Sequence, residues 1–204
     1  MDDQIGFKIT SASAVLGTSV SLTTWEGMWS PYAEEVYTAV LDHIKPTDIV
    51  LDIGAGDLRL ARCMAEKAEK VYAIEMQSTL VEGILPSNLE LFVDDARTRP
   101  FPTDINTAVL LMRHCTHFGL YWNKLTAVGC QRLITNARWR AGVETIDLST
   151  PRVTYDMLDI GWYACQNGHT GFKRGLPEQL TTKMLDFVNE VSFCPACKID
   201  GYNE

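Results

Sequence analysis

Short apolar runs alternate with helical segments through the middle of the chain, and no other feature of the sequence constrains the fold as much. The apolar runs, which we interpret as strands, are 49–53, 71–74, 89–93, 107–112 and 132–135. The helices predicted between them cover 58–68, 78–84 and 121–128. Strands that alternate with helices at this pace are typical of βαβ units, which build a mostly parallel sheet buried on both faces.

The segments on either side of this region follow different patterns. Residues 1–30 show weak periodicity and many serines and threonines, so we expect an irregular N-terminal arm. A helix should follow, with Ser30 as its N-cap and Pro31 in its first turn, and it should end before Pro46. Residues 143–148 alternate apolar with polar side chains, which predicts an antiparallel strand at the edge of the sheet.

Composition and charge exclude several classes of protein. Hydrophobic residues make up 46% of the chain and charged residues 22%, which is ordinary for a globular protein and excludes a disordered one. The net charge of −8 gives no overall attraction for polyanions such as nucleic acids. The central apolar run 108–112 is far shorter than the ~20 residues of a membrane span, so we expect no membrane helix. The chain opens without a signal-peptide pattern, and we expect a cytoplasmic protein.

The turn after the first predicted strand is the most informative segment for function. Gly54 and Gly56 lie where the strand passes into a helix, and glycines there let the backbone approach a ligand closely. Glu75 ends the second predicted strand, where a carboxylate can accept both hydroxyls of a ribose, and Asp95 follows the third, where it can face an adenine. Arg59 stands where nicotinamide and flavin nucleotide sites require glycine, and the turn lacks the lysine of a nucleoside triphosphate loop. The alternative is a turn that only closes a tight corner.

Three runs of the sequence share a family pattern: Val50-Leu51-Asp52-Ile53-Gly54-Ala55-Gly56-Asp57, Val71-Tyr72-Ala73-Ile74-Glu75 and Val93-Asp94-Asp95-Ala96-Arg97. Together they resemble the cofactor half of class I S-adenosylmethionine-dependent methyltransferases. The cofactor-binding residues that the resemblance implies are Asp52, Gly54 and Gly56 at the methionine part, Glu75 at the ribose, and Asp95 with Ala96 at the adenine. Leu58 departs from the pattern, because the family often has a third glycine there.

The resemblance also implies a fold and an activity. The fold is α/β, with a doubly wound, mostly parallel seven-stranded sheet of the Rossmann-like type over 31–160. This domain lies between the arm, 1–30, and a small C-terminal extension that contains Cys and His, 161–204. The activity is methyl transfer from S-adenosylmethionine to a protein side chain or a small molecule, and Ser30-Pro31-Tyr32 looks most like small protein-lysine methyltransferases. RNA methylation and a non-catalytic interaction module that binds the cofactor remain open as alternatives.

Polar and aromatic side chains near the predicted crevice are candidates for the acceptor side. His114 and His117 follow the fourth predicted strand, and either could take a proton, since histidine titrates near neutral pH. Alternatively, one caps the next helix and the other is exposed. The Asn/Asp-Pro-Pro-aromatic motif is absent here, which counts against DNA adenine or cytosine-N4 methylation. Trp25, Trp29 and Tyr32 lie in the arm that would cover the cofactor or recognise substrate, since aromatic faces attract a methylsulfonium or a lysine side chain by cation–π contact. The alternative is that they pack onto the sheet.

Four residues near the C-terminus have the spacing of metal ligands. Cys165 and His169 form a Cys-x3-His pair, and Cys194 and Cys197 form a Cys-x2-Cys pair. Two short pairs with four ligands predict a closed, structural zinc site, with a helix over about 178–191 between the pairs. A redox dithiol and plain free thiols are the alternatives.

Overall fold

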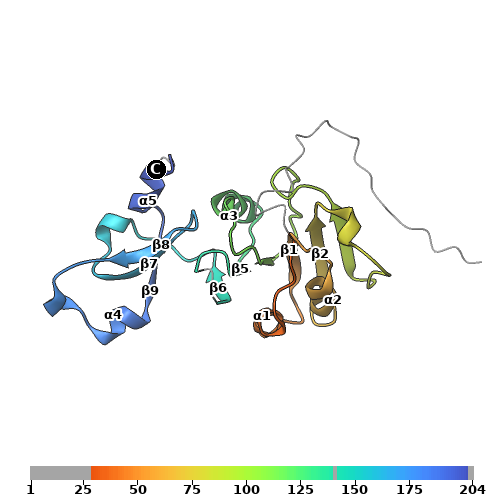
Figure 1. The fold of residues 1–204 in the computed structure, drawn as a ribbon, viewed down its shortest axis with the longest axis horizontal. Coiled ribbons are helices and arrows are strands. Elements are labelled where there is room, and N and C mark those ends of the chain that lie inside the picture. The colour runs from red at the N-terminus through yellow and green to blue at the C-terminus, as the bar shows by residue number, and fades with distance from the viewer. Residues whose placement is uncertain (1–28, 140–141, 202–204) are drawn as a thin grey trace, which may run out of the picture.

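The computed structural model describes residues 29–139 and 142–201, which form two sheets of unequal size (Figure 1). The larger sheet has the order β3-β2-β1-β4-β5-β6. Its strands are β1 (Ile49–Ile53), β2 (Lys70–Glu75), β3 (Leu89–Val93), β4 (Thr107–Leu110), β5 (Arg132–Thr135) and β6 (Glu144–Asp147). The first five are parallel, and β6 pairs antiparallel with β5 at the edge. The doubly wound, mostly parallel architecture is confirmed, with six strands among the described residues rather than the seven expected.

Helices cover both faces of this sheet. They are α1 (Glu34–Leu41), α2 (Arg59–Ala65) and α3 (Phe118–Ala127). On β1, Leu51 and Ile53 belong to the hydrophobic cluster that includes α3, whereas Val50 belongs to the cluster that includes α1 and α2. Successive residues of a strand point to opposite faces, so an uninterrupted apolar run is what a strand buried on both sides requires.

Two predicted helices are shorter than the sequence pattern suggested. The first begins at Glu34 instead of Pro31, because Ala33 is still extended (φ −65°, ψ 151°). The predicted helix 78–84 is wrong beyond a single 3₁₀ turn, η2 (Ser78–Leu80). Gly83 there has φ +79°, and the guanidinium of Arg62 donates hydrogen bonds to carbonyls of this segment, which replaces helical bonding.

The smaller sheet has the order β8-β7-β9. Its elements are β7 (Gly161–Cys165), β8 (Thr170–Lys173), α4 (Thr182–Asp186), β9 (Val188–Val191) and α5 (Pro195–Ile199). The helix expected over 178–191 is therefore wrong, since the end of that segment pairs with β7 as a parallel strand. The domain boundary at residue 160 stays a prediction, and the expected arm lies outside the described residues up to position 28.

The two sheets are joined by a buried arginine. Arg138 is 3% exposed and donates hydrogen bonds to Glu144 on β6 of the larger sheet and to Glu190 on β9 of the smaller one. The N–O distances are 2.7–2.9 Å. No helix in the described part of the chain is long and apolar enough to cross a membrane.

Candidate functional site

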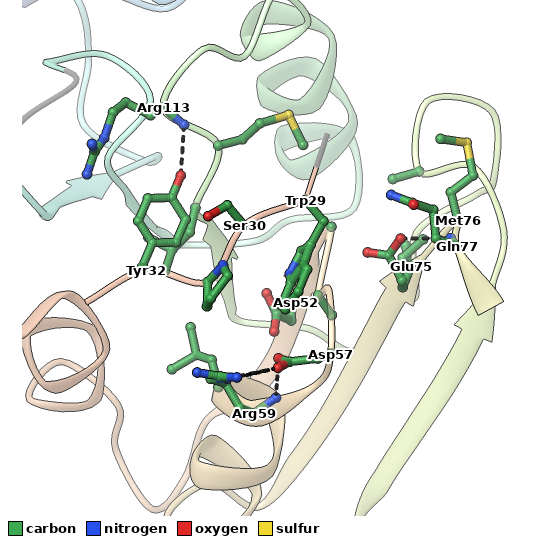
Figure 2. Close-up of a pocket in the computed structure, with 18 of the residues that line it drawn as sticks. Trp29, Ser30, Tyr32, Asp52, Asp57, Arg59, Glu75, Met76, Gln77 and Arg113 are labelled. Carbon is green, nitrogen blue, oxygen red and sulfur yellow. Dashed lines mark hydrogen bonds and ion pairs between the residues drawn. The ribbon is translucent and has the colours of Figure 1, made fainter. Parts of the chain in front are cut away.

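A cavity of about 550 Å³ lies at the carboxyl ends of the central strands (Figure 2). Its walls come from the turn after β1, the end of β2, residues 94–97 after β3 and residues 111–114 after β4, together with the segment 29–33. The strand order reverses between β1 and β4, and this is the point of a doubly wound sheet where ligands bind. A volume of this size is typical of small-molecule sites.

The turn after β1 holds its shape through left-handed residues. Gly54 has φ +73° and Gly56 has φ +58°, conformations that side chains resist. Leu58, at the place of the family's third glycine, is also left-handed (φ 63°) and is fully buried in the cluster with α1 and α2. The energy gained by burying this side chain opposes the roughly 1–2 kcal/mol of left-handed strain, so the turn keeps its course without the glycine.

Glu75 is fixed by the glycine turn. It is 6% exposed, and its two carboxylate oxygens accept the backbone N–H groups of Gly56 at 2.8 Å and Gln77 at 2.7 Å. Each oxygen has a further lone pair, so the carboxylate can still accept bonds from a ligand in the cavity.

Asp52 lies deeper in the cavity wall and lacks such support. It is 3% exposed, and its Oδ2 atom has no hydrogen-bond partner among the described residues. Burial, and secondarily the charge of Glu75, raise the pKa of Asp52 to about 7. A buried carboxylate oxygen without a partner is costly unless a donor or a cation reaches it.

Asp95 lines the cavity and forms an ion pair with Arg97. Its carboxylate accepts hydrogen bonds from the guanidinium of Arg97 at 2.7–3.0 Å, which holds the pKa of Asp95 below its ordinary value. Ala96 is 8% exposed and lines the same wall. Asp95 is therefore ionised at neutral pH, and Arg97 is a neighbour that the sequence pattern did not identify.

The structure places only one of the two candidate histidines at the cavity. His114 lines the cavity, whereas His117 does not and is the N-cap residue of α3, with its Nδ1 atom 3.2 Å from Oγ1 of Thr116. Gly56 is also absent from the lining, because the indole of Trp29 covers it. Trp25 lies outside the described residues.

The Cys/His cluster brings together all four residues that the spacing selected. The possible ligand atoms of Cys165, His169, Cys194 and Cys197 lie within 4.8 Å of one another. The Sγ atom of Cys197 is 3.4 Å from that of Cys165 and 3.8 Å from that of Cys194, and His169 Nδ1 is 3.4–3.5 Å from two of the sulfurs. Sulfur ligands about 2.3 Å from a tetrahedral zinc ion would lie about 3.8 Å apart, so the cluster has the dimensions of such a site.

Two further residues surround the cluster and could not be found from spacing. Nε2 of His169 lies 2.8 Å from a carboxylate oxygen of Asp200, an arrangement that orients metal-binding histidines. Asn167 donates its backbone N–H to the sulfur of Cys165 and its side-chain N–H to that of Cys197, both at 3.4 Å. N–H donors of this kind stabilise thiolates.

Comparisons with known proteins give partial likenesses. No protein-family model and no curated protein matches the chain. Among solved structures it is similar to the YcgJ protein from Bacillus subtilis, at 16% identity over 50% of each chain with a TM-score of 0.41. It is similar to precorrin 8w decarboxylase from Methanobacterium thermoautotrophicum, at 22% identity over 52% of this chain and 63% of that one (TM-score 0.42).

A further similar structure is a dimethyladenosine transferase from Plasmodium falciparum, at 25% identity over 50% of this chain and 39% of that one (TM-score 0.41). The matched region spans less than two thirds of each of these proteins. The doubly wound sheet with an antiparallel edge strand is of the Rossmann-like type.

Proposed function

We propose that this protein is an S-adenosylmethionine-dependent methyltransferase that acts on a protein side chain or a small molecule. The observation that carries the proposal is the convergence of Asp52, Glu75 and Asp95 on one cavity beside a left-handed glycine turn. Each acid comes from the end of a different strand, so only the parallel sheet brings them together.

The residues of the cavity fit this cofactor. Asp52 has a buried oxygen without a partner, and the methionine part of the cofactor carries an ammonium group that would neutralise it. Glu75 retains acceptor capacity for the two ribose hydroxyls. Asp95 and Ala96 form the wall that an adenine would contact.

Methyl transfer requires little of the protein beyond positioning the cofactor and the acceptor. When bound, the cofactor supplies a methyl group already activated on a positively charged sulfur. The protein then has to hold an acceptor in line and exclude water. Residues 111–114 form the wall of the cavity opposite β2, and we assign the acceptor to this side. His114 is placed to take a proton from an acceptor that must lose one, and we assign no such role to His117.

Binding measurements test the cofactor site. Titration calorimetry with S-adenosylmethionine and S-adenosylhomocysteine should show binding to the unmodified protein. Glu75→Ala should weaken it by about tenfold or more, since a charge-assisted bond of about 1.5–3 kcal/mol is lost. Glu90→Ala is the control, because Glu90 lies on the neighbouring strand and outside the cavity. Absence of binding to the unmodified protein would overturn the proposal.

Labelled cofactor then separates an enzyme from a binding module. Incubation of the protein with a cell extract and S-adenosylmethionine labelled in its methyl group should transfer label to an acceptor. Protease treatment, ribonuclease treatment and solvent extraction of the product assign that acceptor to protein, RNA or small molecule. Bound cofactor with no transfer to any fraction would favour the non-catalytic alternative.

We also propose that the Cys/His cluster holds one zinc ion in a structural role. The four ligand atoms and the Asp200 partner of His169 support this, and no ligand position is left open for catalysis. The smaller sheet encloses only a small hydrophobic cluster, formed largely by the three cysteines with Leu158 and Val191, so a metal would supply much of its stability. Thiolate ligands persist in a reducing compartment such as the cytoplasm, which we propose as the location.

Elemental analysis tests the metal site. We expect about one zinc per chain in the purified protein, lost in Cys194→Ser and retained in Cys63→Ser, whose cysteine is exposed on α2. Loss of the metal should make the region 161–201 sensitive to protease while the cavity still binds cofactor. A metal-free protein with a protease-resistant C-terminal region would show that the assignment is wrong.

A further inference from the structure

We propose that residues 29–33 form a strap that closes the empty cavity, with the indole of Trp29 in space that the cofactor takes when it binds. The proposal rests on the methyltransferase function proposed above. It makes the strap part of the binding reaction: the cofactor must displace Trp29 before it can reach the glycine turn.

The position of Trp29 is the first observation. A Cβ atom added to Gly56 would lie 2.1 Å from Nε1 and 2.7 Å from Cδ1 of the indole, so the ring rests directly on this glycine. A glycine at such a turn serves to let a ligand approach the backbone, and here a side chain of the protein takes that place. Trp29 is 40% exposed and lines the cavity.

The other end of the strap is tied to the opposite wall of the cavity. The hydroxyl of Tyr32 accepts the backbone N–H of Arg113 at 3.1 Å, and the guanidinium of Arg113 lies 5.4 Å from the centre of the Tyr32 ring. The backbone N–H of Tyr32 donates to the hydroxyl of Tyr37 on α1 at 3.0 Å. Figure 2 shows the strap running between the glycine turn and the segment that holds Arg113.

This geometry links the two halves of the site. Arg113 belongs to the wall to which we assigned the acceptor, whereas Trp29 lies on the turn to which we assigned the cofactor. Moving Trp29 off Gly56 pulls on a segment only three residues from the Tyr32–Arg113 hydrogen bond. Cofactor binding therefore affects the acceptor wall through the strap.

The strap also sets the measured affinity. If only the open fraction of molecules can bind, the apparent dissociation constant equals the intrinsic constant divided by that fraction. Removing the indole raises the open fraction, so the cofactor should bind Trp29→Ala more tightly than the unmodified protein, with a dissociation constant lowered by about fivefold or more. If Trp29 were only part of the wall that binds the cofactor, its removal would raise the dissociation constant.

The experiment is titration calorimetry with S-adenosylmethionine and S-adenosylhomocysteine on four proteins. These are the unmodified protein, Trp29→Ala, Tyr32→Phe and the control Trp162→Ala, with thermal unfolding measured for each. Trp162 matches Trp29 in exposure, at 37%, but lies on β7. We expect tighter binding for Trp29→Ala, a smaller gain for Tyr32→Phe, which loses only the bond to Arg113, and no change for the control.

The outcomes separate the strap from the proposed function. Equal or weaker binding by folded Trp29→Ala, while the unmodified protein binds, overturns the strap and leaves the methyltransferase assignment intact. Tighter binding by Trp29→Ala than by the unmodified protein, with thermal unfolding unchanged, supports the strap. If neither ligand binds any of the four proteins, the cofactor assignment fails and the strap fails with it. If Trp29→Ala does not fold, the sign of the change in Tyr32→Phe decides.

Discussion

Asp52 illustrates, at the scale of one residue, a cost that a binding site can impose on its fold. Burial and the charge of Glu75 raise the pKa of Asp52 to about 7, so the folded protein holds this proton more tightly than the unfolded chain, where the ordinary value of 3.8 applies. The contribution of Asp52 to stability is therefore most favourable below about pH 4 and is lost as the pH rises through about 7. The site retains a group that destabilises the empty protein at neutral pH.

The substitution Asp52→Asn should stabilise the empty protein. Because the neutral amide carries no charge to bury, we expect the free energy of unfolding to rise by about 2–4 kcal/mol at pH 8 and to change little at pH 4. Urea denaturation at the two pH values measures this, with the exposed Asp159→Asn as control. A gain that is equal at both pH values would contradict the raised pKa.

Cofactor affinity should follow the same titration. An ionised Asp52 attracts a cation and a protonated one does not, so the affinity for S-adenosylmethionine should increase as the pH rises from 6 to 8. Asp52→Asn should bind more weakly at pH 8 and lose this dependence. Calorimetry across the range provides the measurement, and an unchanged pH profile in the variant would assign the titration to another group.

At the scale of the elements, the loop that carries part of the Cys/His cluster contacts α3 of the larger sheet. Gly168, in the loop between two of the possible metal ligands, has φ +92° and lies against the first residue of α3: a Cβ there would be 3.0 Å from Cβ of Phe118. A Cβ added to Gly119 of α3 would lie 2.5 Å from Oδ1 of Asn167, the residue that donates to two of the sulfurs. The loop that surrounds the cluster is therefore packed on the helix that follows the acceptor wall.

A pair of glycine substitutions isolates this contact. Gly168→Ala should cost about 2–3 kcal/mol, because it combines left-handed strain with displacement of Phe118. Gly129→Ala is the matched control: its φ is +76° and nothing lies within 4 Å, so we expect only the strain, about 1–2 kcal/mol. Chemical denaturation compares the two, and equal costs would mean that the loop moves away from α3 without penalty.

Removal of the metal should also destabilise the first turn of α3. If zinc organises the loop 165–169, chelation should speed amide hydrogen exchange in the smaller sheet and in the first turn of α3, while β1, β2 and β3 keep their protection. Exchange measured by mass spectrometry on the treated and untreated protein tests this. Faster exchange spread evenly over both sheets would indicate that the metal stabilises the whole chain rather than one junction.

At the scale of the whole molecule, we expect Arg138 to couple the unfolding of the two sheets. The side chain is 1% exposed and bridges Glu144 and Glu190, which are each about a quarter exposed or less. Taking away one member of a buried ion network leaves the remaining charges unpaired, which costs about 3–5 kcal/mol at full burial and less where water reaches the acids.

Arg138→Met should therefore uncouple the two parts of the molecule. We expect thermal unfolding to change from a single transition to two, with the smaller sheet unfolding first, since its hydrophobic cluster is small. Calorimetry measures the transitions, and the triple variant Arg138→Met, Glu144→Gln, Glu190→Gln should recover part of the lost stability. A single transition that merely shifts to lower temperature would show that other contacts couple the sheets.

The sequence by itself determined the class of fold, and it selected most of the residues that the structure brings together at the cavity and in the Cys/His cluster. Short apolar runs that alternate with helical segments are typical of strands covered on both faces, and a glycine turn after the first such run lies at the ligand edge of the sheet. Spacing alone likewise selected the four residues of the Cys/His cluster, because two short pairs brought together make a tetrahedral set. These features consist of residues close together in the chain, so a single sequence is enough to identify them.

Only the tertiary structure decided how those residues are used. The 178–191 segment has helical stretches in its composition, yet its end becomes β9 because β7 offers a ladder of hydrogen bonds. The contact of Asp200 with His169 and that of the Trp29 indole with Gly56 join residues 31 and 27 positions apart, which no spacing rule encodes. Hydrogen bonds, ion pairs and steric contacts act over a few ångströms in space, and the chain alone does not state which distant residues folding brings within that range.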